Sequence, residues 1–246
     1  MIVIPAIDLQ DGKCVRLLQG DFERSTEYSS DPAEIGRQFS SLAASILHIV
    51  DLDGARYGEQ KNRGIVSAIA QQSQLEIQLG GGIRDEAIMK NWLDAGVSRC
   101  VIGSLAVTEP DTVKAWLSRF GSDRIVLALD VKIDQHNEPI ITTHGWTRDS
   151  ETTLFECVDD FKSAGLQHVL CTDVSRDGAM AGPNFELYER FVASYPKLKL
   201  QASGGVRHIE DLEKLRHIGV SAAISGRALL DGKISAEEIA QFQQDA

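Results

Sequence analysis

The sequence has no long apolar run and no excess of positive charge. No stretch approaches the roughly 18 consecutive apolar residues of a membrane-spanning helix, and the N-terminus enters a strand-like segment without the charged leader of a secretion signal. The formal net charge is -11, the isoelectric point is near 5.0, and no block of Lys or Arg gathers the basic residues. Nucleic acids and anionic membranes are therefore poor partners. We expect a cytoplasmic protein in which a few local groups hold any anionic ligand.

Cysteines are also few, and no interdomain linker is recognisable. The cysteines show no C-x-x-C spacing, so we expect reduced, mostly buried thiols and no metal centre at Cys14, Cys100, Cys157 and Cys171. A chain of 246 residues with 43% hydrophobic residues can fill one sizeable core, and no segment rich in Pro, Gly or Ser divides it. We therefore expect one domain over residues 1–246, and we expect a monomer.

What the sequence does contain is a long internal repeat. The segments PAID, HIV, GGIR and IGS at residues 5–8, 48–50, 81–84 and 102–104 are echoed by LALD, HVL, GGVR and SGR at 127–130, 168–170, 204–207 and 225–227. The four offsets are 122, 120, 123 and 123 positions. Four blocks in one register indicate a duplicated half rather than a solenoid of short repeats. We expect the halves at approximately 1–120 and 121–246.

Short β-branched runs alternate with amphipathic segments of helical length, which is typical of consecutive βαβ units. Eight strands are expected at about 2–8, 46–51, 76–79, 99–102, 125–130, 168–172, 199–202 and 222–224. Helices are expected over 31–44 and 85–95 and after Pro110, Thr152, Asn184, His208 and Ser235, with Asp31 and Pro32 starting the first and Gly96 ending the second. These elements predict an α/β fold, a single-domain (β/α)8 TIM barrel of two similar (β/α)4 halves. An open doubly wound sheet is the alternative.

Two aspartates stand at equivalent strand ends. Asp8 closes the first expected strand and Asp130 the fifth, so the barrel places them on opposite sides of its mouth. Two converging carboxylates suit acid and base catalysis on one small substrate, provided that their surroundings give them different protonation states. A single strand-end Asp more often caps a turn, but two at equivalent positions favour catalysis.

Two glycine-rich turns follow the third and seventh strands. Adjacent glycines, Gly81 with Gly82 and Gly204 with Gly205, let backbone N–H groups converge beside the start of the next helix, which favours phosphate. Ser203 belongs to the second turn, and neighbouring loops would complete the two sites with Gly103, Ser104, Gly226 and Arg227. Two such sites half a barrel apart indicate a ligand with a phosphate at each end, whose middle lies over the aspartates.

Several other polar positions are less specific. Thr172, Asp173, Asp177 and Gly178 crowd the end of the sixth strand and favour a site over plain surface. Trp146 could stack on a ligand ring or pack at an edge, and His48 could be a core residue. The polar segment 19–30, which includes Gly20, is expected to be a loop, either a mobile lid or plain surface.

Taken together, these motifs resemble the ProFAR isomerase family of histidine biosynthesis. The resemblance runs from Met1 to about Leu230, and the segments that carry it are PAIDL with DGK, QGD, VDLDGA, the two Gly-Gly turns, GW at 145–146 and CTDVSRDG at 171–178. It implies a TIM barrel that performs a cofactor-free Amadori rearrangement of ProFAR, N'-((5'-phosphoribosyl)formimino)-5-aminoimidazole-4-carboxamide ribonucleotide. This substrate carries two phosphates and is an aminoaldose, and its product PRFAR is the aminoketose.

The resemblance also implies roles. Asp130 would be the general acid that protonates the ribose ring oxygen, and Asp8 the general base that removes the C2 proton. Thr172 and Asp177 would position the substrate, and Trp146 would stack on its ring. Further substrate contacts would be Arg16, His48 and Arg84, and Arg84 would offer its charge to a phosphate or form an orienting salt bridge. Ala179 departs from the threonine usual in the family, which leaves the backbone donors but removes one hydroxyl and puts one phosphate contact in doubt. Ser225, where an apolar residue is common, is harmless.

Three alternatives stay open at this point. The cyclase subunit of imidazole glycerol phosphate synthase is a similar barrel, but its first strand usually carries a cysteine where this chain has Ala6, and GW at 145–146 favours the isomerase. A bifunctional enzyme would also isomerise phosphoribosylanthranilate. A non-catalytic phosphate-binding barrel would need the Gly-Gly turns but not the aspartates.

Overall fold

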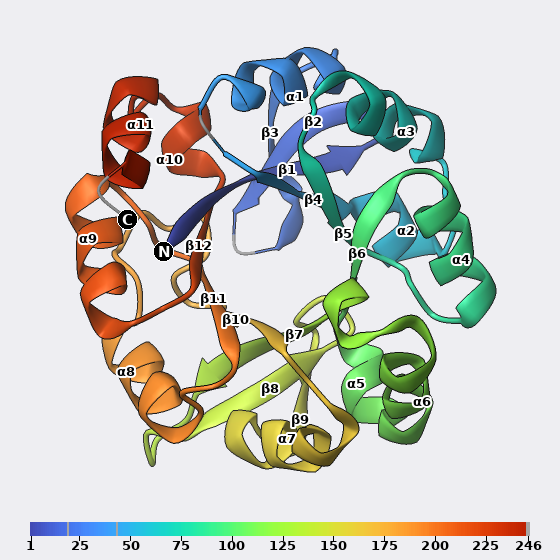
Figure 1. The fold of residues 1–246 in the computed structure, drawn as a ribbon, viewed down its shortest axis with the longest axis vertical. Helices are drawn as coiled ribbons and strands as arrows, with labels where there is room; N and C mark the ends of the chain where they lie inside the picture. Colours follow the sequence, from blue (N-terminus) through green and yellow to red (C-terminus); the bar gives the residue numbers. More distant parts are fainter. Residues whose placement is uncertain (19, 43, 245–246) are drawn as a thin grey trace.

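Eight parallel strands form a closed barrel (Figure 1). The structure, a computed structural model, describes residues 1–18, 20–42 and 44–244. Around the barrel the strands are β1 (Ile2–Gln10), β4 (Ile46–Asp51), β5 (Glu76–Gly80), β6 (Val97–Ile102), β7 (Ile125–Ile133), β10 (His168–Asp173), β11 (Lys199–Ser203) and β12 (Ala222–Ser225). Pairing of β1 with β12 and of β7 with β10 closes the ring. The predicted TIM barrel and its eight strands are therefore confirmed, and an open sheet is excluded.

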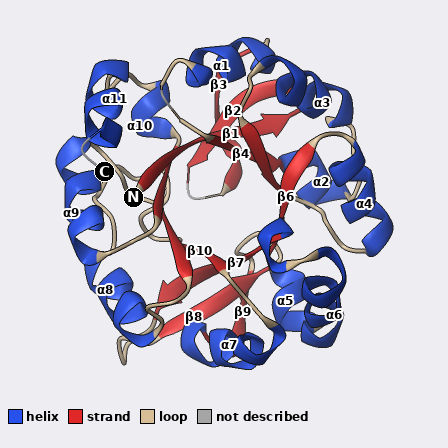
Figure 2. Ribbon diagram, viewed as in Figure 1, coloured by secondary structure: helices blue, strands red, loops and turns tan. Residues whose placement is uncertain are grey.

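Helices surround the barrel on all sides (Figure 2). They are α1 (Pro32–Ser40), α2 (Leu52–Tyr57), α3 (Arg63–Gln72), α4 (Glu86–Asp94), α5 (Ser104–Thr108), α6 (Pro110–Phe120), α7 (Leu154–Phe161), α8 (Phe185–Ser194), α9 (Ile209–Ile218), α10 (Arg227–Leu230) and α11 (Ala236–Gln244), with 3-10 turns η1 (Ser122–Arg124) and η2 (Lys162–Ala164). Asp31 caps α1 as predicted, its carboxylate accepting hydrogen bonds from the N–H groups of Ala33 and Glu34. The helix ends at Ser40, earlier than the expected residue 44; Ala43 lies outside the described residues.

Two antiparallel hairpins at the barrel mouth were not predicted. The first is β2 (Lys13–Leu18) with β3 (Asp21–Ser29), and the second is β8 (Pro139–Thr143) with β9 (Arg148–Thr153). Each follows the first barrel strand of one half and pairs with it. The expectation of a loop over 19–30 was wrong for most of its length. Because β3 is exposed on both faces, its sequence does not alternate between apolar and polar residues as a half-buried strand does. Gln19 lies outside the described residues.

The barrel interior is packed rather than open. Its apolar layer consists of Ile4, Ala6, Ile46, Val101, Val126, Leu170, Ala222 and Ile224. A second and larger apolar cluster fills the space between the strands and the helices. Inward-facing side chains of a TIM barrel make such a plug, which leaves the carboxyl ends of the strands as the place for chemistry. The four cysteines are free and buried, as expected.

Candidate active site

Asp8 is a buried carboxylate held by one arginine. It lies on β1 opposite Val15 of β2 and is 5% exposed. Nη1 of Arg16, also on β2, donates to Oδ2 of Asp8 over 3.1 Å. Burial raises the pKa of Asp8, and the Arg16 charge opposes that rise. Asp8 can therefore act as a base because Arg16 stabilises its ionised form.

Arg16 joins Asp8 to a second carboxylate. Its Nη2 donates to Oδ1 of Asp177 over 2.6 Å, from the loop between β10 and α8. The charge of Asp177 raises the pKa of Asp8 and also that of Asp130, so this carboxylate lies within electrostatic reach of both. The predicted residues Asp8, Arg16 and Asp177 thus meet at one point.

Asp130 has a different partner from Asp8. It lies on β7, and Nε1 of Trp146 donates to its Oδ2 over 2.8 Å. Burial raises the pKa of Asp130, while hydrogen bonds from Trp146 and Thr172 lower it. Within the described chain, no Lys or Arg forms an ion pair with Asp130. Because no described cation offsets the burial of this carboxyl, Asp130 is better suited than Asp8 to hold a proton.

The turn that carries Trp146 has an unusual backbone. His144, Gly145 and Trp146 all have positive φ, at 55°, 64° and 69°. The N–H of His144 donates to Oγ of Ser104 over 2.9 Å, which ties the turn to the start of α5. Two non-glycine residues in the left-handed region mark strain that is common at functional sites. The indole ring thereby reaches Asp130 and the space above it.

The two hairpins meet over the barrel mouth at Gly20. A Cβ atom added to Gly20 would lie 2.7 Å from Cε3 of Trp146. Gly20 has a φ of 74° and belongs to the turn between β2 and β3. Only a residue without a side chain fits against the indole there. This contact gives the predicted site residue Gly20 a physical role.

The first Gly-Gly turn follows β5. Gly81 and Gly82 have φ of 107° and 71°, values that L side chains rarely adopt. Gly103, at the end of the neighbouring β6, caps the short helix α5 without a side-chain hydrogen bond. The N–H groups at this helix start are therefore not satisfied by a capping side chain.

The second Gly-Gly turn, after β11, has the same construction. Gly204 and Gly205 have φ of 92° and 88°. Gly226 precedes α10, again without a capping side chain. Nη1 of Arg227 donates to the carbonyl of Gly178 over 2.7 Å, so Arg227 connects the start of α10 to the loop that carries Asp177. Two equivalent turns thus flank the aspartates from opposite sides of the barrel.

The arginines that follow the glycines do not point at the turns. Arg84 is exposed and donates to the carbonyl of Ala55 over 3.0 Å. Its counterpart Arg207 pairs with Asp211 at 2.7 Å. Both arginines fix loops, which favours the orienting role for Arg84 over a phosphate contact.

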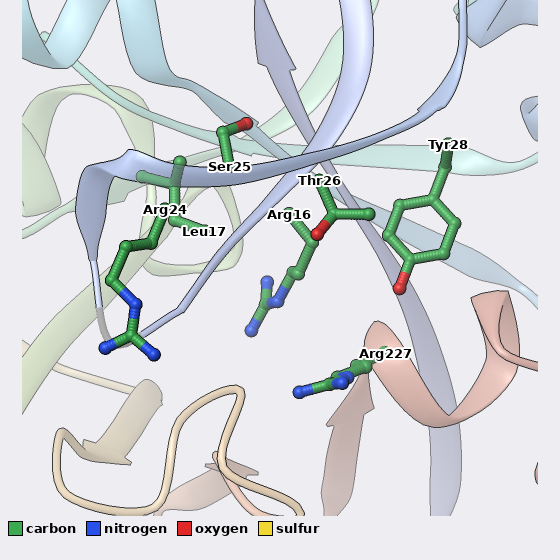
Figure 3. A pocket seen from close by; sticks show the side chains of 7 residues that line it. All are labelled: Arg16, Leu17, Arg24, Ser25, Thr26, Tyr28 and Arg227. Carbon is green, nitrogen blue, oxygen red and sulfur yellow. The ribbon is translucent and has the colours of Figure 1, made fainter.

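A cationic cavity of about 280 Å³ lies between the first hairpin and α10. Figure 3 shows the guanidinium groups of Arg16, Arg24 and Arg227 directed into it. Ser25, Thr26 and Leu17 contribute to its walls, together with Tyr28, whose hydroxyl donates to Asp231 over 2.6 Å. Sequence reasoning missed Arg24 and Tyr28, because both lie in the segment expected to be a loop. Within the segment 19–30 Arg24 is the one basic residue among the acidic residues Asp21, Glu23 and Glu27, so no local pattern indicated a cationic cavity.

His48 faces the barrel interior below the site. Its Nδ1 is 3.2 Å from Nε2 of Gln78, and Gln78 exchanges two hydrogen bonds with Gln201 at 2.7 and 2.9 Å. Burial lowers the pKa of His48 to about 4, so the ring is neutral at physiological pH. Because the Gln78 amide donates, Nδ1 accepts and Nε2 carries the proton.

The remaining predicted positions cluster on β10 and β11. Thr172 pairs in register with Asp130 on one side and with Ser203 on the other. At Ala179 the backbone donor expected to be available to a phosphate is not free, because its N–H donates to the carbonyl of Arg176 over 3.1 Å. The N–H of Ala179 therefore stabilises a turn within the loop between β10 and α8.

Within residues 1–18, 20–42 and 44–244, no group of three or more His, Cys, Asp or Glu side chains is arranged to hold a metal ion. In the same part of the chain, no helix has the length and apolar character needed to cross a membrane.

Comparison with known proteins shows the family of this chain. The family described as Histidine biosynthesis protein matches residues 2–235. The chain belongs to this family. Curated relatives include proteins of Alteromonas mediterranea (45% identity over all of both chains), Elusimicrobium minutum (47%, covering 97% of this chain and 98% of the relative) and Vibrio cholerae (44%, covering 96% and 97%). Each is named 1-(5-phosphoribosyl)-5-((5-phosphoribosylamino)methylideneamino)imidazole-4-carboxamide isomerase.

Proposed function

We propose that this family member is a ProFAR isomerase, which converts the aminoaldose ProFAR to the aminoketose PRFAR in histidine biosynthesis. The observation that carries the proposal is the placing of two carboxylates, the buried Asp8 and the half-buried Asp130, on opposite strands between two equivalent Gly-Gly turns. A ligand with a phosphate at each end fits this arrangement. The names of the relatives favour this activity over the cyclase and bifunctional alternatives.

The chemistry follows from the different partners of the two aspartates. Asp130 donates its proton to the ribose ring oxygen as the C1–O bond breaks, which opens the furanose to a Schiff base. Asp8 then accepts the proton of C2, and the released electron pair forms the enolamine, which tautomerises to the ketose. Arg16 keeps Asp8 ionised for this step, whereas burial raises the pKa of Asp130 and no described Lys or Arg pairs with it, which suits a group that begins protonated.

The ends of the substrate have separate contacts in this proposal. One phosphate binds at Gly81, Gly82 and Gly103, and the other at Gly204, Gly205 and Gly226, where uncapped helix starts offer N–H groups. Arg24 and Arg227 add positive charge beside the second site. Trp146 covers the middle of the ligand.

The test is turnover of purified protein with ProFAR, followed spectrophotometrically in the absence of ammonia. Wild type should form PRFAR, and Asp8→Asn and Asp130→Asn should each lower kcat by several orders of magnitude while the substrate still binds. Conversion that requires ammonia would indicate the cyclase instead. Growth of a tryptophan auxotroph that lacks phosphoribosylanthranilate isomerase would reveal the bifunctional activity. Unchanged function in Asp8→Asn would favour a phosphate-binding barrel.

We also propose that the enzyme acts in the cytoplasm as a monomer on a small-molecule substrate. The acidic surface charge argues against nucleic-acid and membrane partners. Light scattering on the purified chain should give a mass near 26.9 kDa. A mass of twice that value would refute the monomer.

A further inference from the structure

Each Gly-Gly turn rests on the backbone of the loop before it. A Cβ at Gly81 would overlap the carbonyl of Asp51, and one at Gly82 would overlap that of Gly54. The position of this turn therefore depends directly on the loop that starts at Asp51.

The second turn repeats the arrangement. A Cβ at Gly204 would lie 3.1 Å from the carbonyl of Asp173, and one at Gly205 would overlap the carbonyl of Gly182. The N–H of Gly182 also donates to the carbonyl of Gly205 over 3.0 Å. A shift of either supporting loop would displace its turn.

An aspartate and an asparagine hold each supporting loop together. Nδ2 of Asn62 donates to Oδ1 of Asp51 over 2.7 Å, and Nδ2 of Asn184 donates to Oδ2 of Asp173 over 2.8 Å. Asp51 and Asp173 end β4 and β10, while Asn62 and Asn184 immediately precede α3 and α8. Each hydrogen bond thus closes the whole βα loop beneath a Gly-Gly turn. Both pairs are 122 positions apart, in the register of the repeat.

The two pairs differ in how well the carboxylates are satisfied. Asn62 also donates to Oδ2 of Asp53 over 2.8 Å, and Oδ2 of Asp51 is buried without a hydrogen-bond partner in the described structure. Asp173 is fully partnered, because its Oδ1 accepts from the N–H and the hydroxyl of Ser175 at 2.9 and 2.6 Å. In the first pair the amide of Asn62 therefore donates to two buried carboxylates, those of Asp51 and Asp53.

We propose that Asn62 and Asn184 are matched positioning residues, each of which sets the place of one phosphate-binding turn through its aspartate. This inference rests on the proposed function, because it assigns a phosphate to each turn. Neither asparagine contacts the substrate; each acts through the loop backbone that supports the glycines.

The test compares Asn62→Ala and Asn184→Ala with Tyr195→Phe. The hydroxyl oxygen of Tyr195 lies 3.0 Å from the carbonyl oxygen of Phe155 and 2.9 Å from Oδ1 of Asp159, so its one proton is shared between these acceptors at the far end of the helix that Asn184 precedes. All three variants should melt below wild type. Only the asparagine variants should raise KM for ProFAR, by about tenfold (~1.4 kcal/mol), with kcat within about threefold, the pattern of lost ground-state binding. An unchanged KM in both would overturn the proposal.

Exchange of the two residues separates positioning from simple destabilisation. Asp173→Asn combined with Asn184→Asp keeps a donor facing an acceptor and leaves Ser175 and the N–H of Leu187 their acceptors, so KM should return to within about threefold of wild type. Asp51→Asn combined with Asn62→Asp should not recover, because the carboxylate introduced at position 62 faces Asp53. Failure of the first exchange to restore KM would overturn the proposal.

Failure of the proposed function would look different. Wild-type protein that leaves ProFAR unchanged would refute the isomerase activity. The positioning role would then be measured with inorganic phosphate by ³¹P NMR titration of wild type and the same variants. Dissociation constants that rise in both alanine variants and not in Tyr195→Phe would support it, and equal constants would overturn it.

Discussion

Replacing Arg16 with methionine should damage both stability and the base. Arg16 donates to Asp8 and Asp177 at 3.1 and 2.6 Å, and the three side chains are only 16%, 7% and 11% exposed. Removing one partner from a buried ion pair costs about 3–5 kcal/mol, because the remaining charge stays buried. For a chain of this size, 3 kcal/mol lowers Tm by about 6–12 °C. Differential scanning calorimetry measures this directly.

The pH dependence of activity tests the role of Arg16 more sharply. Arg16 lowers the pKa of Asp8 through its charge and its hydrogen bond, so its loss raises that pKa further. A base is inactive when protonated, so the acidic limb of the kcat/KM profile should move up by about one unit or more. Arg16→Lys, which keeps the charge, should show a smaller movement. An acidic limb that stays in place in Arg16→Met would refute the assignment of Asp8 as the base.

The stability difference between wild type and Arg16→Met should itself depend on pH. The pKa of Asp8 is raised in the folded state, so the stability linked to its protonated form is present at low pH and is lost as pH rises through the folded pKa. The variant has the higher folded pKa. Its deficit should therefore be larger at pH 8 than at pH 4, as urea titrations at the two values would show. A deficit independent of pH would contradict the electrostatic explanation.

Two further predictions concern packing. Gly20→Ala should raise KM several-fold and change tryptophan fluorescence, because its Cβ meets the Trp146 ring; unchanged fluorescence would show that the hairpins move apart freely. The four thiols should resist iodoacetamide at pH 8 in the folded protein and react in urea, as counted by mass spectrometry. Burial raises the pKa of Cys14, Cys100 and Cys157 to about 12 and raises that of Cys171 well above its ordinary value. Rapid alkylation of the native protein would contradict this burial.

The barrel was predictable because its strands carry a strong local signal. Strands covered on both faces read as continuous apolar runs, and β4 (Ile46–Asp51) begins and ends where the sequence predicted. The hairpins were missed for the opposite reason. Residues of β3 are mostly exposed on both sides, so their polarity resembled that of a loop. Arg24 and Tyr28 were missed with it.

Parts of the site were predictable for similar reasons. Asp8 and Asp130 stood out at the ends of apolar runs, and the repeat paired them. Asn184 was expected only as a helix start, and it does cap α8 through Leu187. Its second hydrogen bond, to Asp173, joins residues 11 positions apart and has no local pattern. Arg16 was predicted only from the family resemblance, because its carboxylate partners Asp8 and Asp177 come close to it only in the folded chain.

The last prediction concerns the cause of the difference between the two aspartates. Each aspartate lies on a barrel strand that is followed by a hairpin. The first hairpin supplies the cation Arg16 to Asp8, and the second supplies the neutral donor Trp146 to Asp130. The Trp146 hydrogen bond lowers the pKa of Asp130, so Trp146→Phe raises it. An acid must be protonated to work, and the basic limb of the kcat/KM profile should therefore move to higher pH.

The acidic limb separates this effect from that of Arg16. It should stay in place in Trp146→Phe, because Trp146 is not among the groups that shift the pKa of Asp8. Titration of the substrate phosphates is common to wild type and variant and cancels in the comparison. Arg16→Met moves the acidic limb and Trp146→Phe the basic one, so each hairpin controls one limb. A basic limb unmoved by Trp146→Phe would mean that a group other than Asp130 donates the proton.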